Sequence, residues 1–222
     1  MRSSVNFLLG DEPRELTDID PTMTVLRYLR EVEGRVGSKE GCAEGDCGAC
    51  TVVLAEVQGD ALTYRAVNAC IQFVPTLEGK QLLTVEDLKA SDGALHPVQQ
   101  SMVDNHGSQC GFCTPGFVMS LHALYQQGGA QDRLEIDNAL AGNLCRCTGY
   151  GPIVAAARAM TDYDAPAEGD MPVAEVIAHL KGLQEGDGVS LEWRGRKYFA
   201  PRSLEALAAI YKHHTEANIL AG

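Results

Sequence analysis

Eight cysteines form two sets whose spacing is typical of metal-binding sites. The first set contains Cys42, Cys47, Cys50 and Cys70. The second set contains Cys110, Cys113, Cys145 and Cys147. Clustered thiols in a reducing compartment are more often metal ligands than disulfides, and a chain of 222 residues can bury an apolar core without disulfides. The sequence therefore predicts two metal centres with four thiolate ligands each, and four disulfides are the less favoured alternative.

The first set has the spacing C-x4-C-x2-C followed by a distant fourth cysteine, which is the plant-type arrangement around a 2Fe–2S cluster. A loop that wraps such a cluster needs positive φ values and close backbone approach, and Gly41, Gly45 and Gly48 permit both. Zinc sites built from four cysteines usually use two separated CxxC pairs. We therefore predict a 2Fe–2S cluster here, with structural zinc as the alternative.

The second set lies in SQCGFCTPGF and NLCRCTGYGP, where each pair of cysteines comes directly before an expected helix. Thr114 followed by Pro115 is a typical helix start, and Thr148 with Gly149 is expected to act similarly. Two helix N-termini directed at one site would each stabilise an anionic cluster by about 0.3–1 kcal/mol. This pattern favours a second 2Fe–2S cluster, and a zinc knuckle stays open as the alternative.

Residues 1–83 have the pattern of a small sheet that grasps one helix. Strands are expected at 4–9, 14–19, 51–57, 62–67 and 80–85, and a helix at 21–34. The buried face of this helix should carry Val25, Leu26, Leu29 and Val32, with Gly34 as its end. Because the cysteine loop follows the helix and precedes the next strand, we predict a β-grasp, ferredoxin-like domain.

Residues 84–163 have helical spacing throughout. After a short helix capped by Thr84, four helices are expected at 96–107, 114–129, 135–142 and 150–160. This pattern predicts an all-α four-helix bundle that holds the second set of thiols.

The remainder of the chain changes character twice. Residues 164–190 are rich in Gly, Pro, Asp and Glu and are expected to be a linker with room for one short helix. Residues 191–222 then start a new unit, with a strand, a turn, a capped helix at 203–214 and a strand at 217–222. Because the sequence stops there, we expect a truncated α/β domain. The predicted class of the whole chain is α+β.

Composition narrows the range of partners. The chain has 18 basic and 30 acidic side chains, a formal net charge of −12, which repels nucleic acid and anionic lipid. The apolar run at residues 7–9 is too short for a signal peptide, and no run reaches the roughly 20 residues that span a membrane. We therefore expect a cytoplasmic protein without nucleic-acid or membrane partners.

Three motifs taken together resemble one family. They are GCAEGDCGACTV, GSQCGFCTPGF and AGNLCRCTGYGPI. Over about residues 5–160 the chain is similar to the iron–sulfur part of the molybdenum hydroxylases of the xanthine dehydrogenase/aldehyde oxidase family, with all eight cysteines in place. The stretch from His96 to Tyr125 most resembles the small (iron–sulfur/FAD) subunit of the bacterial members.

The resemblance implies an electron-transfer subunit that itself makes and breaks no substrate bonds. A molybdopterin-binding large subunit would hydroxylate a purine such as xanthine or hypoxanthine, and electrons would pass through the second cluster, the first cluster and FAD to NAD. By motif, Gln109 and Cys147 would lie near the molybdopterin, with Cys147 also a cluster ligand; capping a helix is the alternative role for Gln109. The implied assembly is a hetero-oligomer such as a dimer of heterodimers.

The last residues resemble the opening of the family's FAD domain. Its first phosphate-binding loop would begin at Leu220, Ala221 and Gly222, and an ordinary strand end is the alternative. The rest of a flavin domain is absent from this sequence. Other functions stay open: a free-standing ferredoxin-type carrier, the iron–sulfur subunit of a related aldehyde or N-heterocycle hydroxylase, or a zinc-bound scaffold.

Overall fold

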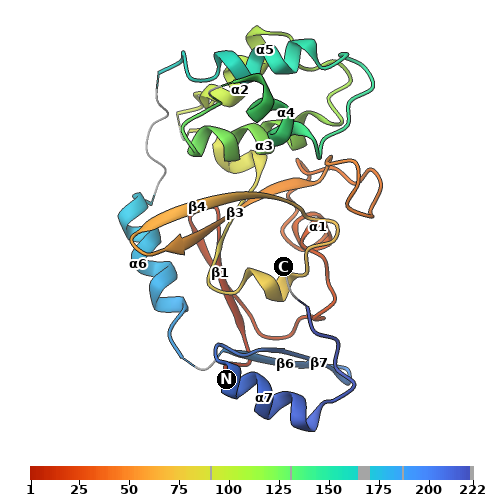
Figure 1. Cartoon of the computed structure of the whole chain (residues 1–222), viewed down its shortest axis with the longest axis vertical. Helices are drawn as coiled ribbons and strands as arrows, with labels where there is room; N and C mark the ends of the chain where they lie inside the picture. The colour runs from red at the N-terminus through yellow and green to blue at the C-terminus, as the bar shows by residue number, and fades with distance from the viewer. Residues whose placement is uncertain (91, 131, 165–170, 187, 221–222) are drawn as a thin grey trace.

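A five-stranded mixed sheet occupies the centre of the molecule, and a group of helices sits over one end of it (Figure 1). The computed structural model describes residues 1–90, 92–130, 132–164, 171–186 and 188–220. The strands are β1 (Val5–Leu9), β2 (Glu12–Leu16), β3 (Thr51–Gln58), β4 (Ala61–Asn68) and β5 (Gln81–Leu83). Their order is β2-β1-β5-β3-β4, in which only the β1–β5 pair is parallel. All five predicted strands are therefore present, but the second lies at 12–16 and not at the predicted 14–19.

One short helix packs on the sheet as expected, but its last turn presents different residues to the sheet. Helix α1 (Val25–Arg27) continues into a π-helical turn, η1 (Tyr28–Val32), and Gly34 follows with φ +71°. Val32 is 60% exposed, so its predicted burial is wrong, while Tyr28 is buried against Phe7. A π turn inserts an extra residue per turn, which rotates Val32 away from the face that the 3.6-residue period assigns to it.

The alternation of side chains along the strands assigns each face of the sheet a different partner. Phe7, Leu9 and Leu54 belong to the core that contains α1, whereas the intervening Leu8 and Val53 point to the opposite face. Val53 packs in the core of the helices and Leu8 packs against α6 (Val173–Leu183). Strand β3 is thus covered on both faces, which explains its continuous apolar run.

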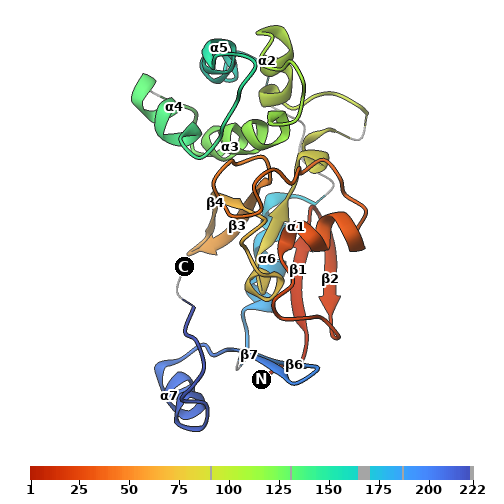
Figure 2. The ribbon, with the colours of Figure 1, turned by 90° about the vertical axis from the view of Figure 1, so that its right-hand side faces the viewer.

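The helical part begins with the short η3 (Val85–Leu88), which Thr84 caps as predicted, in a capping box with Asp87. It contains α2 (Pro97–Asp104), α3 (Thr114–Gln126), α4 (Arg133–Leu140) and α5 (Gly151–Ala159), and all four expected helices are confirmed. Their apolar side chains share one buried core, and α3 lies closest to β3 and β4 (Figure 2). This contact fixes the helices to the cysteine-bearing end of the sheet.

Both predicted helix caps beside the second thiol set differ from the prediction. The N-cap of α3 is Cys113, and Thr114 is instead the first helical residue, with its hydroxyl 2.7 Å from that of Ser108. The N-cap of α5 is Tyr150, whose N–H donates to the Thr148 hydroxyl at 3.2 Å. Each threonine is held by the turn around its cysteines and so is not available to cap the helix.

The interval expected to be a linker contains the 11-residue helix α6, which covers the sheet face opposite α1. Val176 and Leu180 are buried beside Leu8, and the Lys181 ammonium lies 2.7 Å from the Asp60 carboxylate. Beyond it, β6 (Val189–Trp193) and β7 (Arg196–Ala200) form an antiparallel hairpin. Val189 of this hairpin is buried in the α1 core. The boundaries between domains stay a prediction.

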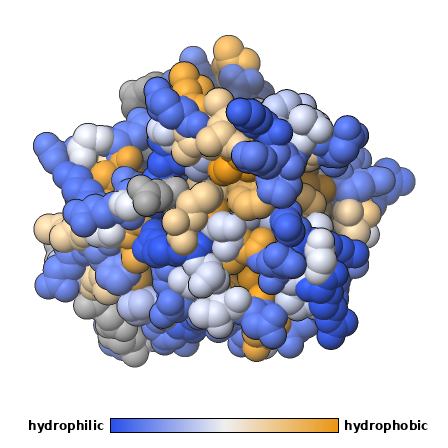
Figure 3. All heavy atoms as spheres, turned by 90° about the horizontal axis from the view of Figure 1, so that it is seen from below, coloured by the Kyte–Doolittle hydropathy of each residue, from blue (hydrophilic) through white to orange (hydrophobic). Residues whose placement is uncertain are grey.

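The end of the chain carries an amphipathic helix with little packing. Helix α7 (Leu204–His213) is capped by Ser203, as predicted, and none of its residues is buried. Leu204 is 79% exposed, and this end of the molecule mixes apolar with hydrophilic surface (Figure 3). The predicted strand at 217–222 is wrong for residues 217–220, which are not in a strand; Ala221 and Gly222 lie outside the described residues. Within the described ranges no helix is both long and apolar enough to cross a membrane.

Candidate metal centres

The first set of thiols gathers where the cysteine loop meets the open end of the β3–β4 hairpin. The pairing of Thr51 with Asn68 sets Cys50 and Cys70, just beyond these strand ends, beside one another. After burial, the Cys50 thiol is the next largest influence that raises the pKa of the Cys70 thiol, so these two side chains are neighbours. The Cys42 and Cys47 side chains form a second such pair within the loop. All four predicted residues are therefore brought together, as two pairs.

Backbone N–H groups of the loop point at the sulfur of Cys42. The N–H groups of Asp46 and Cys47 donate to Cys42 Sγ at 3.3 Å each. Together with the N–H of Glu44, they lower the pKa of the Cys42 thiol to about 6, which favours the thiolate. Burial raises the pKa of the Cys70 thiol to about 12. The site thus has one pair in a thiolate-favouring loop and one pair in the protein interior.

Glycines shape this loop in two different ways. Gly45 and Gly48 have φ values of +84° and +70°, as predicted. Gly41 lies outside the left-handed region, but a Cβ there would lie 2.8 Å from Cys47 Sγ. Close approach, and not backbone conformation, is therefore what requires glycine at position 41.

The second set of thiols lies between the helices. Cys110 and Cys113 precede α3, and Cys145 and Cys147 lie in the loop from α4 to α5. Cys145 adds to the effect of burial in raising the pKa of Cys113, and Cys110 raises the pKa of Cys147, so the thiols again lie as two neighbouring pairs. The inner pair is partly buried, while Cys110 and Cys147 are exposed. All four predicted residues are thus brought together here as well.

The two members of the inner pair differ in acidity. Burial raises the pKa of Cys113 to about 12. Burial also opposes ionisation of Cys145, but hydrogen bonds with the side chain and backbone of Thr148 outweigh it and lower the Cys145 pKa. The Cys145 sulfur lies 3.2 Å from the Thr148 hydroxyl oxygen. The inner pair therefore combines one thiol whose surroundings lower its pKa with one whose burial raises it.

The paired arrangement distinguishes between the kinds of metal group that four thiols can hold. A 2Fe–2S cluster has two irons, each bound by two thiolates, whereas zinc draws four ligands around one ion. In the part of the chain that the structure describes, no three His, Cys, Asp or Glu side chains converge in a group that could hold a single metal ion. None of the eight cysteines, all of which are described, is in a disulfide. The paired arrangement of both donor sets therefore fits a cluster with two irons.

Sequence reasoning missed several side chains that support these loops. The Cys145 N–H donates to the Tyr150 hydroxyl at 2.9 Å, and the Tyr150 ring meets Phe117 edge-on with centroids 6.2 Å apart. The Asn68 amide donates to the Gly45 carbonyl at 2.6 Å. The available signals were polar residues close to cysteines, such as Asn68 two positions before Cys70. They carry no information about partners that lie far away in sequence.

The two thiol sites are in direct contact. The N–H of Leu144, the residue before Cys145, donates to the carbonyl of Cys47 at 3.0 Å. Phe112, between Cys110 and Cys113, lies against the first loop, so that a Cβ on Gly41 would be 3.5 Å from its ring. Residues of one site are therefore bonded to residues of the other with no element between them.

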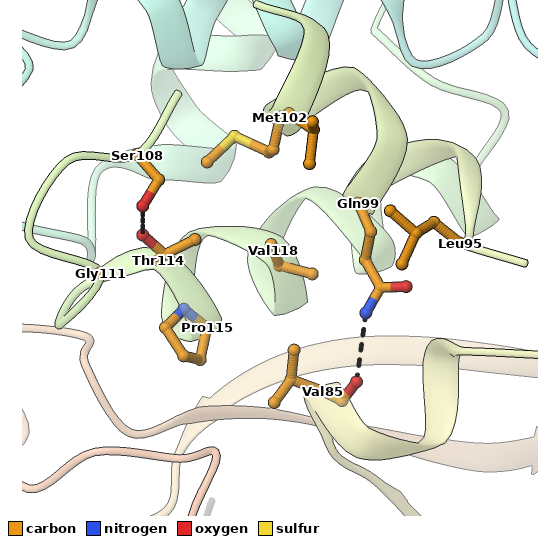
Figure 4. Close-up of a pocket in the computed structure, with 10 residues that line it drawn as sticks. Val85, Leu95, Gln99, Met102, Ser108, Gly111, Thr114, Pro115 and Val118 are labelled. Atoms are coloured by element: carbon orange, nitrogen blue, oxygen red, sulfur yellow. Dashed lines mark hydrogen bonds between the residues drawn. The ribbon is translucent and has the colours of Figure 1, made fainter. Parts of the chain in front are cut away.

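A cavity of about 330 Å³ borders the loop that carries Cys110 and Cys113 (Figure 4). Met102 and Val118 line it, and it reaches Gly111 within the loop. Leu95 and Val103, on its rim, are 42% and 57% exposed. The surface beside the second site is thus hollow and largely apolar.

Of the other predicted site residues, the structure describes Gln109 and Leu220, whereas Ala221 and Gly222 lie outside the described residues. Gln109 is exposed and directly precedes Cys110. It does not cap α3, since the N-cap there is Cys113. Leu220 lines a cavity of about 700 Å³ together with Ile71 and Gln72, which follow Cys70. The described end of the chain and the residues that follow Cys70 therefore line the same cavity.

Two protein families match the two parts of the chain that carry the thiols. Residues 8–74 match the family described as 2Fe-2S iron-sulfur cluster binding domain, and residues 84–158 match the family described as [2Fe-2S] binding domain. Each match contains one complete set of four cysteines. The chain thus has two 2Fe–2S binding domains.

The chain is also similar to parts of much longer enzymes. It is 47% identical over 159 residues to the xanthine dehydrogenase of Blastobotrys adeninivorans, a match of 70% of this chain and 11% of that protein. It is 47% identical over 154 residues to xanthine dehydrogenase 1 of Arabidopsis thaliana, again covering 11% of the relative and 68% of this chain. The chain therefore spans about a ninth of the length of these curated relatives.

Solved structures include one of comparable length. One chain of quinoline 2-oxidoreductase from Pseudomonas putida 86 is 32% identical with a TM-score of 0.59, and the match covers 96% of that chain and 72% of this one. The aldehyde oxidoreductase of Desulfovibrio desulfuricans is 30% identical with a TM-score of 0.63, over 22% of that chain and 84% of this one. The chain belongs to the xanthine dehydrogenase and molybdenum hydroxylase family and corresponds to its iron–sulfur part.

Proposed function

We propose that this chain transfers electrons through two 2Fe–2S clusters as part of a larger oxidoreductase. The proposed ligands of the first cluster are Cys42, Cys47, Cys50 and Cys70. Those of the second are Cys110, Cys113, Cys145 and Cys147. Such clusters supply one-electron transfer when bound. The observation that carries the proposal is the assembly of both sets as two thiol pairs, in two sites joined by the Leu144–Cys47 hydrogen bond.

The second site is the proposed entry point for electrons from a molybdopterin-binding partner subunit. Cys110 and Cys147 are exposed there, and the apolar rim formed by Leu95 and Val103 suits a protein partner. In this proposal Gln109 and Cys147 lie next to the partner's molybdopterin. In this proposal the chain holds the second cluster at its surface, and the Cys113–Cys145 pair binds that cluster on its inner side.

The first site is the proposed exit toward FAD and then NAD. The phosphate-binding loop of the flavin domain would begin at Leu220, Ala221 and Gly222. Leu220 lines the same cavity as Ile71 and Gln72, the two residues that follow Cys70, and this shared lining supports the proposal. The exposed apolar side chains of α7 also fit a segment that packs against a further domain.

The proposed substrate of the whole enzyme is a purine such as xanthine or hypoxanthine, as the names of the relatives suggest. A related aldehyde or N-heterocycle hydroxylase is the alternative, since the similar solved structures act on such compounds by name. The proposed organisation has a β-grasp domain at 1–83, a four-helix bundle at 84–163, a linker at 164–190 and a flavin-domain start at 191–222. We further propose a cytoplasmic dimer of heterodimers.

Iron and acid-labile sulfide should be counted on the anaerobically purified protein, and its EPR spectrum recorded after reduction with dithionite. About four irons and four sulfides per chain, with two distinguishable rhombic signals, are expected. Two zinc ions without an EPR signal would replace the proposal with a zinc scaffold. Purification without a large molybdenum-containing subunit, with both clusters present, would favour the free-standing ferredoxin-type carrier.

A further inference from the structure

The contact between the two thiol sites contains one polar side chain that joins three separate segments. Asn143 is 4% exposed and lies two residues before Cys145. Its Nδ2 donates to the Gly48 carbonyl at 3.1 Å and to the Thr51 hydroxyl at 3.2 Å. Its Oδ1 accepts from the Ser120 hydroxyl at 2.6 Å. The amide therefore bonds the first cysteine loop, the start of β3 and helix α3 at once.

The backbone around Asn143 is packed too tightly for side chains. A Cβ on Gly48 would lie 2.2 Å from the Gly142 carbonyl oxygen, and a Cβ on Gly116 would lie 2.0 Å from the Gly48 carbonyl oxygen. Gly48 stands between Cys47 and Cys50, and Gly116 follows Cys113 by three residues. The chain segments that carry thiols of both sites thus meet backbone to backbone at this amide.

These contacts give the amide a role beyond local stability. A buried amide that satisfies donors and acceptors on three segments fixes their relative positions, because any displacement leaves a buried polar group unpaired. Gly48 and Thr51 are each next to a proposed cluster ligand in the sequence, and Ser120 lies in the helix that begins directly after the ligand Cys113. The geometry points to Asn143, with Ser120 and Thr51, as a positioning residue that sets the separation and orientation of the two iron–sulfur centres.

This inference rests on the proposed function, since it needs both clusters. It is tested with the variants Asn143→Leu and Ser120→Ala in the full protein, with Ser101→Ala as the matched control. Ser101 is also a fully buried helical serine. Its hydroxyl, however, donates to the Val98 carbonyl of its own helix and is not part of the contact around Asn143. A general loss of stability would affect Ser120→Ala and Ser101→Ala alike.

Two properties of the reduced protein report directly on the contact around Asn143 that connects the two thiol sites. One is the magnetic interaction between the two reduced clusters in the EPR spectrum, which depends on their separation. The other is the rate of electron transfer between them after rapid reduction of one. We expect Asn143→Leu to broaden the EPR signature of the magnetic interaction or abolish it, and to slow electron transfer between the clusters by about tenfold. We expect Ser120→Ala to slow electron transfer by about threefold. Ser101→Ala should leave both properties unchanged.

The possible results separate this inference from the proposed function. If the unmodified protein does not contain two clusters, both the proposed function and this inference are overturned. If it has both clusters and Ser120→Ala and Asn143→Leu keep the native interaction and rate, only the role of Asn143 is overturned. If Asn143→Leu does not fold, Ser120→Ala compared with Ser101→Ala decides. An equal change in these two serine variants also overturns the inference.

Discussion

The two thiol sites solve the same coordination problem in different ways. The first is wrapped by one glycine-rich loop, and its inner pair, Cys50 and Cys70, is buried. The second is built from two loops that precede helices, and its outer pair, Cys110 and Cys147, is exposed. The comparison teaches that a loop laid against the end of a strand hairpin encloses its site, whereas helix ends leave one side open, which suits the site proposed to face a partner.

The largest effect should come from removing one ligand in each site. We expect Cys50→Ala to lower the iron content from about four to about two per chain and to abolish one EPR signal. Cys147→Ala should abolish the other signal and leave the first. Because Cys50 is buried and Cys147 exposed, Cys50→Ala should also lower the free energy of unfolding more. Loss of both signals in either variant would contradict two independent sites.

Gly48, which lies at the contact around Asn143, can be compared with Gly149 in the second site. Gly48 and Gly149 have φ values of +70° and +67°, but only Gly48 would place a Cβ against backbone. We expect Gly149→Ala to cost about 1 kcal/mol for its conformation. Gly48→Ala should cost about 3 kcal/mol or more, because a clash adds to the same strain. Urea unfolding measures both, and equal losses would mean that the close contact with Gly142 does not matter.

A buried pair of histidines should make the helical part more sensitive to acid than the sheet. His96 and His122 have ring centroids 4.9 Å apart, between Tyr64 of β4 and Tyr125 of α3. Within the described residues His96 Nε2 and His122 Nδ1 have no hydrogen-bond partner. Burial lowers the pKa of His96 to about 4. Burial and the neighbouring His96 ring together lower the pKa of His122 to about 3.

The sign of the pH effect follows from these lowered pKa values. The neutral rings stabilise the fold fully above the ordinary pKa of about 6.5, and this stability is lost as the pH falls toward 4. Between pH 7 and pH 5 we expect a loss of about 2 kcal/mol per histidine. His122→Phe should reduce this pH dependence in thermal unfolding, whereas His213→Phe, at an exposed position, should not. An unchanged slope in His122→Phe would remove the histidines as the cause.

The smallest effect concerns the Tyr150 hydroxyl, which accepts from the Cys145 N–H. Tyr150→Phe should cost about 1 kcal/mol of unfolding free energy. It should also alter the EPR signal of the second centre without altering that of the first. Tyr163→Phe is the control, since that hydroxyl donates to Asp104 at the surface at 2.9 Å. A change in the first signal in Tyr150→Phe would show that the hydroxyl acts on both sites.

The sequence by itself determined the local features of this protein. The cysteine spacing, the apolar alternation of the strands and the helical periods depend on neighbours along the chain, so strands β1 to β5, helices α2 to α5 and both thiol sets could be predicted. Errors arose where local rules compete with the surroundings. The π turn exposed Val32, and the cysteine turns engaged Thr114 and Thr148 before they could cap a helix.

Only the tertiary structure decided how the thiols pair and how the two sites meet. Cys42 with Cys47 and Cys113 with Cys145 are separated by different lengths of chain, and spacing does not say which thiols become neighbours. The packing of α6 on the sheet and the joint around Asn143 connect residues far apart in sequence. Such contacts depend on how two faces fit together in space, which no local pattern encodes.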